Sequence, residues 1–151
     1  AEEFLNSYFA KFPEIKVYMD QTIKFCRKSG YVNNIFGRKS HFMNINDKNF
    51  NIRNFQERAA INAPIQGSAS EIMRLAMIRL SEKLNDQKNN KTKMLLQIHD
   101  ELIFETPEDD VKRISKIIIE EMSSVVNSDH HSFSIPLTVD LNTGNNWGQL
   151  H

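Results

Sequence analysis

The chain has 151 residues, of which 40% are hydrophobic and 25% charged, a globular composition that excludes a disordered chain. Its single cysteine, Cys26, excludes a disulfide framework within the chain, and no apolar run has the length of a membrane span. The net charge is zero, but residues 1–83 carry 13 basic and 8 acidic side chains, whereas residues 84–151 carry 6 and 11. This asymmetry indicates a basic half suited to phosphates and an acidic half suited to cations.

Two helices are predicted at the amino-terminal end. From Glu2 to about Lys11, apolar residues recur at three- and four-residue steps, the spacing of one helical face. Pro13 fits the first turn of a second helix, which is expected to run to about Ser29 and to end at the cap residue Gly30. We expect the aromatic side chains of this region to be part of a core and not a surface for base stacking.

The next segment, residues 31–42, favours β-structure around a glycine-containing turn. It lies in the most basic part of the chain, because residues 24–58 contain eight basic and two acidic side chains. Such a region is either a solvated loop or a contact for a nucleic-acid backbone, which requires cations but no sequence readout. The candidate backbone contacts are Arg38, Lys39, Lys48 and Arg53. Residues 44–49 are expected to form an exposed connection.

A long helical region is predicted from about Arg53 to Leu84, with an interruption near Pro64 and Gly67. Three polar side chains follow at four-residue steps and so share one helical face: Arg58, Asn62 and Gln66. Such a face suits the minor groove of a duplex, where the acceptors are alike for every correct base pair. An ordinary solvated helix face has the same pattern. The apolar stripe beyond Gly67 is expected to be core.

The acidic half contains two short apolar runs, residues 94–98 and 102–105, separated by His99-Asp100-Glu101. The runs are too short for a free-standing helix and favour two strands joined by a turn. Adjacent carboxylates at a turn repel each other, and a hard divalent cation held by oxygen ligands would stabilise both. The other interpretation is a soluble turn, because aspartate is a common turn residue.

A helix over about residues 108–126 is predicted to start after Thr106 and Pro107, a cap and a first-turn proline. Residues 135–141 are expected to form another strand. Residues 85–93 are expected to form a polar loop, with His130-His131 exposed and not bound to metal.

The expected fold class is α+β. A small antiparallel sheet, with a hairpin that carries the two carboxylates, is expected to pack on two helices. The predicted strands are residues 94–98, 102–105 and 135–141, and the helices cover about 68–84 and 108–126.

Four tracts stand in a specific order and spacing: Glu57–Gly67, His99-Asp100-Glu101, Asn145-Asn146-Trp147 and His151. Together they resemble the carboxy-terminal end of family A DNA polymerases, in which His-Asp-Glu is palm motif C. The resemblance runs from about Tyr8 to His151. It implies three catalytic residues: Asp100 as a metal ligand, Glu101 as an auxiliary ligand, and His99 near the primer terminus. It also implies three contacts to primer–template DNA on the minor-groove side: Arg58, Gln66 and, in support, Asn62.

The resemblance further implies that residues 1–52 are the distal part of the fingers and residues 53–151 the carboxy-terminal part of the palm. The implied cofactor is Mg²⁺, two ions in the complete enzyme, and the implied partners are primer–template DNA and dNTPs, with no membrane. The implied location is the cytoplasm (the bacterial nucleoid) or an organelle.

Two parts of the family pattern are not matched in these 151 residues. One is the other metal-binding aspartate, on the upstream motif A strand, and the other is the helix that grips the triphosphate. We therefore expect the chain to be the final piece of a larger polymerase, inactive without the missing upstream part.

Two other functions remain as alternatives. A non-catalytic nucleic-acid-binding module would use the basic half and leave the carboxylates in a turn. A metal phosphohydrolase would use His99-Asp100 as ligands, but it needs further His and Asp ligands that converge, usually from helices.

Overall fold

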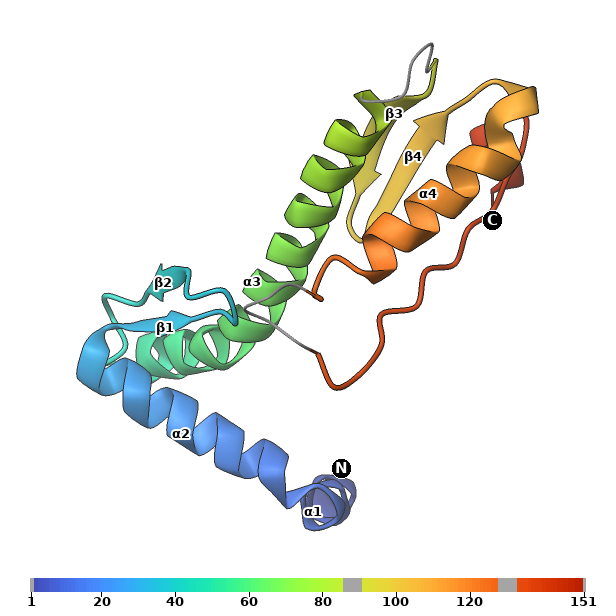
Figure 1. Cartoon of the computed structure of the whole chain (residues 1–151). Coiled ribbons are helices and arrows are strands. Elements are labelled where there is room, and N and C mark those ends of the chain that lie inside the picture. The colour runs from blue at the N-terminus through green and yellow to red at the C-terminus, as the bar shows by residue number, and fades with distance from the viewer. Residues whose placement is uncertain (1, 86–90, 128–132, 151) are drawn as a thin grey trace. The chain divides into compact units, whose positions relative to one another are not determined.

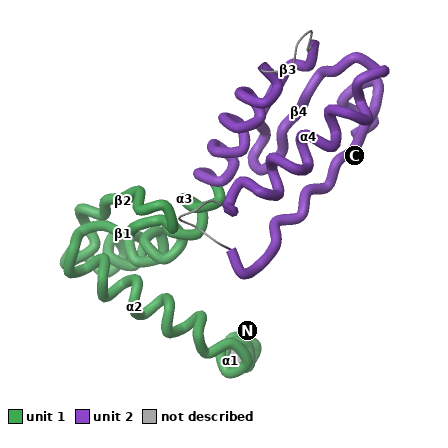
Figure 2. The backbone as a smooth tube through the Cα atoms, in the orientation of Figure 1, with its two compact units in different colours: residues 1–69 green, residues 70–151 purple. Residues whose placement is uncertain are grey.

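The computed structural model describes residues 2–85, 91–127 and 133–150. These form two compact units, residues 1–69 and 70–151 (Figure 2). The elements, labelled in Figure 1, are as follows: α1 (Glu2–Lys11), α2 (Pro13–Ser29), β1 (Tyr31–Asn33), β2 (Lys39–His41), α3 (Phe50–Asn85), β3 (Lys93–Ile98), β4 (Glu101–Glu105), η1 (Glu108–Asp110), α4 (Val111–Ser123) and η2 (Trp147–Gln149). No helix among the described residues is long and apolar enough to cross a membrane.

The bounds predicted for α1 and α2 are confirmed, because the signals that set them are local. Pro13 occupies the first turn of α2, where its missing N–H is not needed. Gly30 caps the helix with φ 78°, and its N–H donates to the carbonyl of Cys26 at 2.7 Å. A residue with a Cβ is strained in this left-handed conformation, which explains the glycine.

The core of the first unit joins α2, the β1–β2 hairpin and α3. It consists of the buried residues Cys26, Val32, Ile45 and Ala60, with Phe42 and Ala63 packed against them. Burial raises the pKa of the Cys26 thiol, so this side chain serves as a small packing group. The expectation that residues 44–49 are all exposed is wrong at Ile45, which fills this core.

The aromatic side chains between Phe4 and Phe12 do not form a core within this unit, contrary to prediction. Phe4 is 74% exposed, and Tyr8 and Phe12 are also exposed. Tyr8 contacts the rings of Phe9 and Phe12 at centroid distances of 5.7 and 5.2 Å. An apolar helical stripe is buried only where another element covers it, and α1 with α2 does not enclose this one.

Helix α3 runs for 36 residues, and the predicted interruption near Pro64 and Gly67 does not occur. Pro64 cannot donate to the carbonyl of Ala60, which removes one helical hydrogen bond. The helix nevertheless continues past the proline, and the hydroxyl of Ser68 donates to the carbonyl of Pro64 at 2.5 Å. The low helix propensity of Pro64 is therefore outweighed by the rest of the helix and its packing.

In the second unit, β3 and β4 form an antiparallel hairpin that packs on α3 and α4 (Figure 1). The packed residues are Leu80 and Leu84 of α3, Ile114 and Ile118 of α4, and Met94, Leu102 and Phe104 of the strands. The expected α+β architecture, a small antiparallel sheet on helices, is confirmed. The predicted helix over 108–126 begins with the short η1, and α4 proper ends at Ser123.

The predicted third strand, residues 135–141, does not form. Its apolar residues still alternate as in a strand, since Leu137, Val139 and Leu141 are half-buried and the residues between them exposed. A strand also needs a partner edge for its N–H and C=O groups, and Pro136 has no N–H to give. The predicted polar loop over 85–93 lies mostly outside the described residues, and His130-His131 lie wholly outside them.

Candidate metal centre and nucleic-acid interface

The β3–β4 hairpin turns on two residues, His99 and Asp100. Ile98 pairs with Glu101, so the loop between the paired strands has the minimum length. His99 has φ 53°, and it is the one non-glycine residue with positive φ in the described part of the chain. Tight two-residue hairpin turns require positive φ at their first position, which is costly for a residue with a Cβ. The side-chain amide of Gln97 donates to the carbonyl of His99 at 3.3 Å and supports this turn.

The register decides which face of the hairpin each side chain occupies. Leu102 and Phe104 face the helices, so Gln97, paired with Leu102, lies on that side too. Glu101 lies on the opposite, open face, in register with Ile98. A bulge at Leu95 lets Met94 return to the packed face opposite Phe104. The turn is thus anchored by packing from below, and its carboxylates point away from the core.

The donor set at this turn fits Mg²⁺ in kind and supplies part of an octahedral site. Asp100 and Glu101 are adjacent exposed carboxylates, and His99 beside them is also exposed. Mg²⁺ prefers oxygen ligands in an octahedral arrangement, usually with one or two carboxylates and several waters or phosphates. Among the described residues, no three His, Cys, Asp or Glu side chains converge as a metal site. The turn thus offers two carboxylates, and water, phosphate or further protein ligands would fill the other positions of an octahedral ion.

The polar face predicted on α3 is present. Arg58, Asn62 and Gln66 are all exposed and follow one another at four-residue steps within a continuous helix. Their donors are therefore available to a ligand in solvent. This face belongs to the first unit and the carboxylate turn to the second.

The four basic residues predicted as backbone contacts differ in their surroundings. Arg53 is half-buried; its guanidinium donates to the carbonyl of Asp47 at 2.9 Å and lies 3.9 Å from the carboxylate of Glu57. Lys39 is exposed, and its ammonium lies 4.4 Å from the ring centroid of Tyr31. Arg38 and Lys48 are exposed as well. Arg53 therefore has a structural role in the first unit, whatever else it contacts.

Sequence reasoning missed Asn34, which fixes the basic turn on α3. Asn34 is buried, and its side-chain oxygen accepts hydrogen bonds from the N–H groups of Phe36 at 3.0 Å and Arg38 at 2.9 Å. Its amide nitrogen donates to the carbonyl of Gly67 at 3.2 Å, directly after Gln66. An asparagine three residues before a turn glycine was a usable signal for the local hydrogen bonds. The hydrogen bond to Gly67 joins residues 33 positions apart in the sequence, and this spacing gives no signal for it.

Ser68 reinforces the same junction, because its hydroxyl accepts the N–H of Ile35 at 3.1 Å. Asn34 and Ser68 therefore join the Arg38-bearing turn to the helix segment that carries Gln66.

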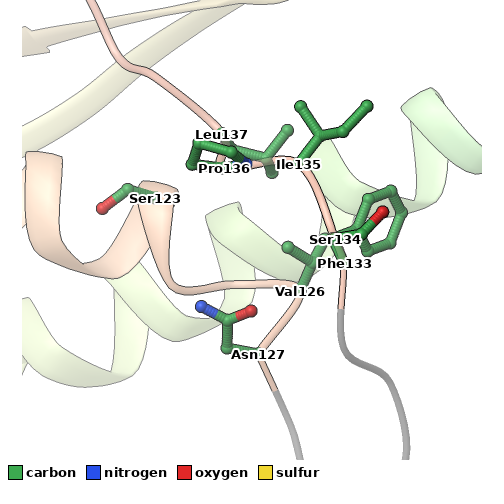
Figure 3. Close-up of a pocket in the computed structure, with 8 residues that line it drawn as sticks. All are labelled: Ser123, Val126, Asn127, Phe133, Ser134, Ile135, Pro136 and Leu137. Atoms are coloured by element: carbon green, nitrogen blue, oxygen red, sulfur yellow. The ribbon is translucent and has the colours of Figure 1, made fainter.

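A pocket of about 300 Å³ lies in the second unit, where the chain after α4 meets the carboxy-terminal tail (Figure 3). It is lined by uncharged residues: Ser123, Val126, Asn127, Phe133, Ser134, Ile135, Pro136 and Leu137. None of these lining residues carries an ionisable side chain, and the pocket lies apart from the carboxylate turn in the chain.

Comparison with known proteins gives a consistent result. The family model for DNA polymerase family A matches residues 1–149. DNA polymerase I of Caldicellulosiruptor bescii is 42% identical over 147 residues, which cover 97% of this chain and 17% of that protein. DNA polymerase I of Streptococcus pneumoniae serotype 4 is also 42% identical over 147 residues, 16% of its length. This chain therefore spans about one sixth of the length of these relatives.

A solved structure agrees with the sequence relatives. It is the POL domain of Pol1 from M. smegmatis in complex with DNA primer-template and dNTP, which matches with a TM-score of 0.89 at 32% identity. The match covers 97% of this chain and 25% of that one.

We predict that Asn34→Ala destabilises the 151-residue chain by about 2 kcal/mol, because it leaves the N–H groups of Phe36 and Arg38 without their buried acceptor. Chemical unfolding monitored by circular dichroism measures this change. Hydrogen exchange at the two amides should become faster as well.

The matched control is Asn33→Ala, at the exposed neighbouring position, with an expected change within about 0.5 kcal/mol. Equal effects of the two substitutions would contradict the role assigned to Asn34.

Proposed function

Since this chain belongs to DNA polymerase family A, we propose that it is the carboxy-terminal part of a DNA-directed DNA polymerase. The complete enzyme extends a primer along a template by nucleotidyl transfer from dNTPs. The observation that carries the proposal is the tight, anchored turn that presents Asp100 and Glu101 to solvent. Because the chain is about one sixth of its relatives, the activity is assigned to the whole polymerase.

We assign residues 1–52 to the distal fingers and residues 53–151 to the carboxy-terminal palm. The compact units divide elsewhere, at Ala69 inside α3, because the β1–β2 hairpin packs on the first part of that helix. In this assignment α3 belongs to the palm from Arg53 onward, and its first part also supports the end of the fingers.

Asp100 is assigned as a direct ligand of a catalytic Mg²⁺ ion and Glu101 as an auxiliary ligand. Bound Mg²⁺ supplies the activation of the primer 3′-hydroxyl and the neutralisation of the leaving pyrophosphate, and the complete enzyme uses two ions. The chain's own contribution is to hold the carboxylates at a strained turn supported by packed strands, so little reorganisation is needed. His99, at the same turn, lies beside the primer terminus.

Arg58, Asn62 and Gln66 are assigned to the minor groove of the primer–template. Their exposed donors meet purine N3 and pyrimidine O2, which occupy similar positions in every correct pair. Such contacts check the shape of a pair without reading its sequence. Arg38, Lys39 and Arg53 are assigned to the DNA backbone, with Arg53 the least available because of its protein contacts.

A non-catalytic nucleic-acid-binding module is the second candidate. It is favoured by one observation, that no complete metal site converges among the described residues. The same observation gives a His-Asp phosphohydrolase no support, since that enzyme needs several converging ligands. Substitution of Asp100 separates catalysis from binding.

In the intact polymerase, we predict that Asp100→Asn lowers the rate of single-nucleotide incorporation by roughly 10³-fold, because the amide has the size of the carboxylate but lacks its charge. Affinity for primer–template should stay within about threefold, because phosphate binding rests on the basic residues. Single-turnover kinetics and fluorescence anisotropy measure the two quantities.

Asp109→Asn, at an exposed position of η1, is the matched control and should keep the wild-type rate. A near-normal rate for Asp100→Asn would reject Asp100 as a catalytic metal ligand and leave this part of the polymerase as a nucleic-acid-binding module.

We also predict that the 151-residue chain alone does not extend a primer with Mg²⁺ and all four dNTPs. Its carboxylate turn supplies only part of an octahedral site, and the residues that grip a triphosphate are assigned to the upstream part. A primer-extension assay beside the intact polymerase tests this. Templated extension by the chain alone would show that it holds a complete site.

A further inference from the structure

The outer face of the β1–β2 hairpin gathers aromatic and basic side chains. Tyr31 pairs with His41 and Asn33 with Lys39, and cross-strand partners lie on the same face of an antiparallel pair. The intervening pair places Val32 on the other side, where it is buried in the core. The outer face therefore carries Tyr31, Asn33, Lys39 and His41.

Three of these side chains, Tyr31, Lys39 and His41, form one contact group with Phe25 of α2. The ring of Tyr31 lies 5.7 Å from that of Phe25, edge to face at 87°, and 5.7 Å from that of His41, tilted at 55°. The ammonium of Lys39 lies 4.4 Å from the Tyr31 centroid. Phe25 is 46% exposed, and Lys39 and His41 are exposed too. We call Phe25, Tyr31, Lys39 and His41 the hairpin face.

The chemistry of this face selects a class of ligand. Aromatic rings stack on nucleobases without regard to sequence, and a neighbouring ammonium binds the phosphate that joins them. The segment from Tyr31 to His41 contains no aspartate or glutamate, so no carboxylate opposes a phosphate there. In a duplex, base faces are covered by stacking on their neighbours. An unpaired nucleotide, in contrast, offers its faces to these rings.

We propose that the hairpin face is a stacking platform for an unpaired nucleotide of the template strand ahead of the primer terminus. The proposal rests on the proposed polymerase function, since the unpaired part of a primer–template is the template overhang. It adds Phe25, Tyr31 and His41 to the DNA-contacting residues. It also gives Lys39 a specific partner, the phosphate beside the stacked base.

The surroundings of the hairpin suit this role. Asn34 and Ser68 bond the turn to α3, so the strands that carry the rings are held in place before any ligand binds. Lys39, in contrast, meets Tyr31 through a solvent-exposed cation–π contact, which is weak. Its long flexible side chain leaves the ring readily for a phosphate.

The test measures binding by the intact polymerase without dNTP, using fluorescence anisotropy and two DNAs. One is a primer–template with a short single-stranded 5′ overhang, and the other is the blunt duplex of the same paired sequence. Tyr31→Leu should weaken binding of the overhang DNA about tenfold, the size expected for loss of one stacked base, and change blunt-duplex binding less than about twofold. Tyr31→Phe keeps the ring and should bind as the wild type does.

Two further variants cover the case in which Tyr31→Leu fails to fold. His41→Leu changes an exposed ring and should also weaken binding of the overhang DNA selectively. Lys39→Gln should reduce the salt dependence of overhang binding by about one phosphate contact. The matched control is Phe12→Leu, an exposed aromatic with Lys11 over its ring at 5.7 Å, outside the hairpin face. It should leave both affinities unchanged.

Equal weakening on both DNAs would overturn the proposal, because the face would then contact the duplex and not the unpaired strand. Unchanged affinity for the overhang DNA in the folded variants would overturn it as well. The outcome is independent of the catalytic assignment, since Asp100→Asn is judged by incorporation rate and the hairpin face by selective binding of the overhang.

Discussion

Pairing of Ile98 with Glu101 leaves only His99 and Asp100 to reverse the chain, and the candidate chemistry depends on that constraint. The strands cannot slip by one residue without turning Leu102 and Phe104 away from Leu80 and Ile114, which would expose the core of the second unit. Packing thus holds a turn whose first residue has an unfavourable positive φ. The same register places Glu101 on the open face and Asp100 at the tip. The packing of the hairpin on α3 and α4 therefore determines where the carboxylates of Asp100 and Glu101 lie.

The basic half has a comparable constraint of its own. The turn that carries Arg38 would be an ordinary surface loop without Asn34, whose side chain satisfies two of its N–H groups and the carbonyl of Gly67. Gln66 and the Arg38 turn are therefore parts of one rigid junction within the first unit. The aromatic outer face of the hairpin is fixed by the same bonds.

Sequence reasoning succeeded where the determinants are local. Pro13 and Gly30 mark the ends of α2, and the short apolar runs around His99-Asp100-Glu101 mark the hairpin. It failed where contacts with distant residues determine the structure. Pro64 lies inside α3, and Ile45 packs in a core made by three other elements. Residues 135–141 do not pair with a strand. The polar face of Arg58, Asn62 and Gln66 was predictable from helical spacing alone, and it is exposed. Asn34 was predictable only for its local bonds to the turn, because its contact with Gly67 lies far along the chain.

The central claim is that the turn at Asp100 holds a catalytic divalent ion together with ligands from the upstream part of the polymerase. Anomalous diffraction from crystals of the intact polymerase with primer–template DNA, dNTP and Mn²⁺ in place of Mg²⁺ tests this most directly. The account predicts an anomalous peak within about 2.5 Å of a carboxylate oxygen of Asp100. A fully occupied catalytic centre whose metal ions all lie beyond coordination distance of Asp100 would contradict it.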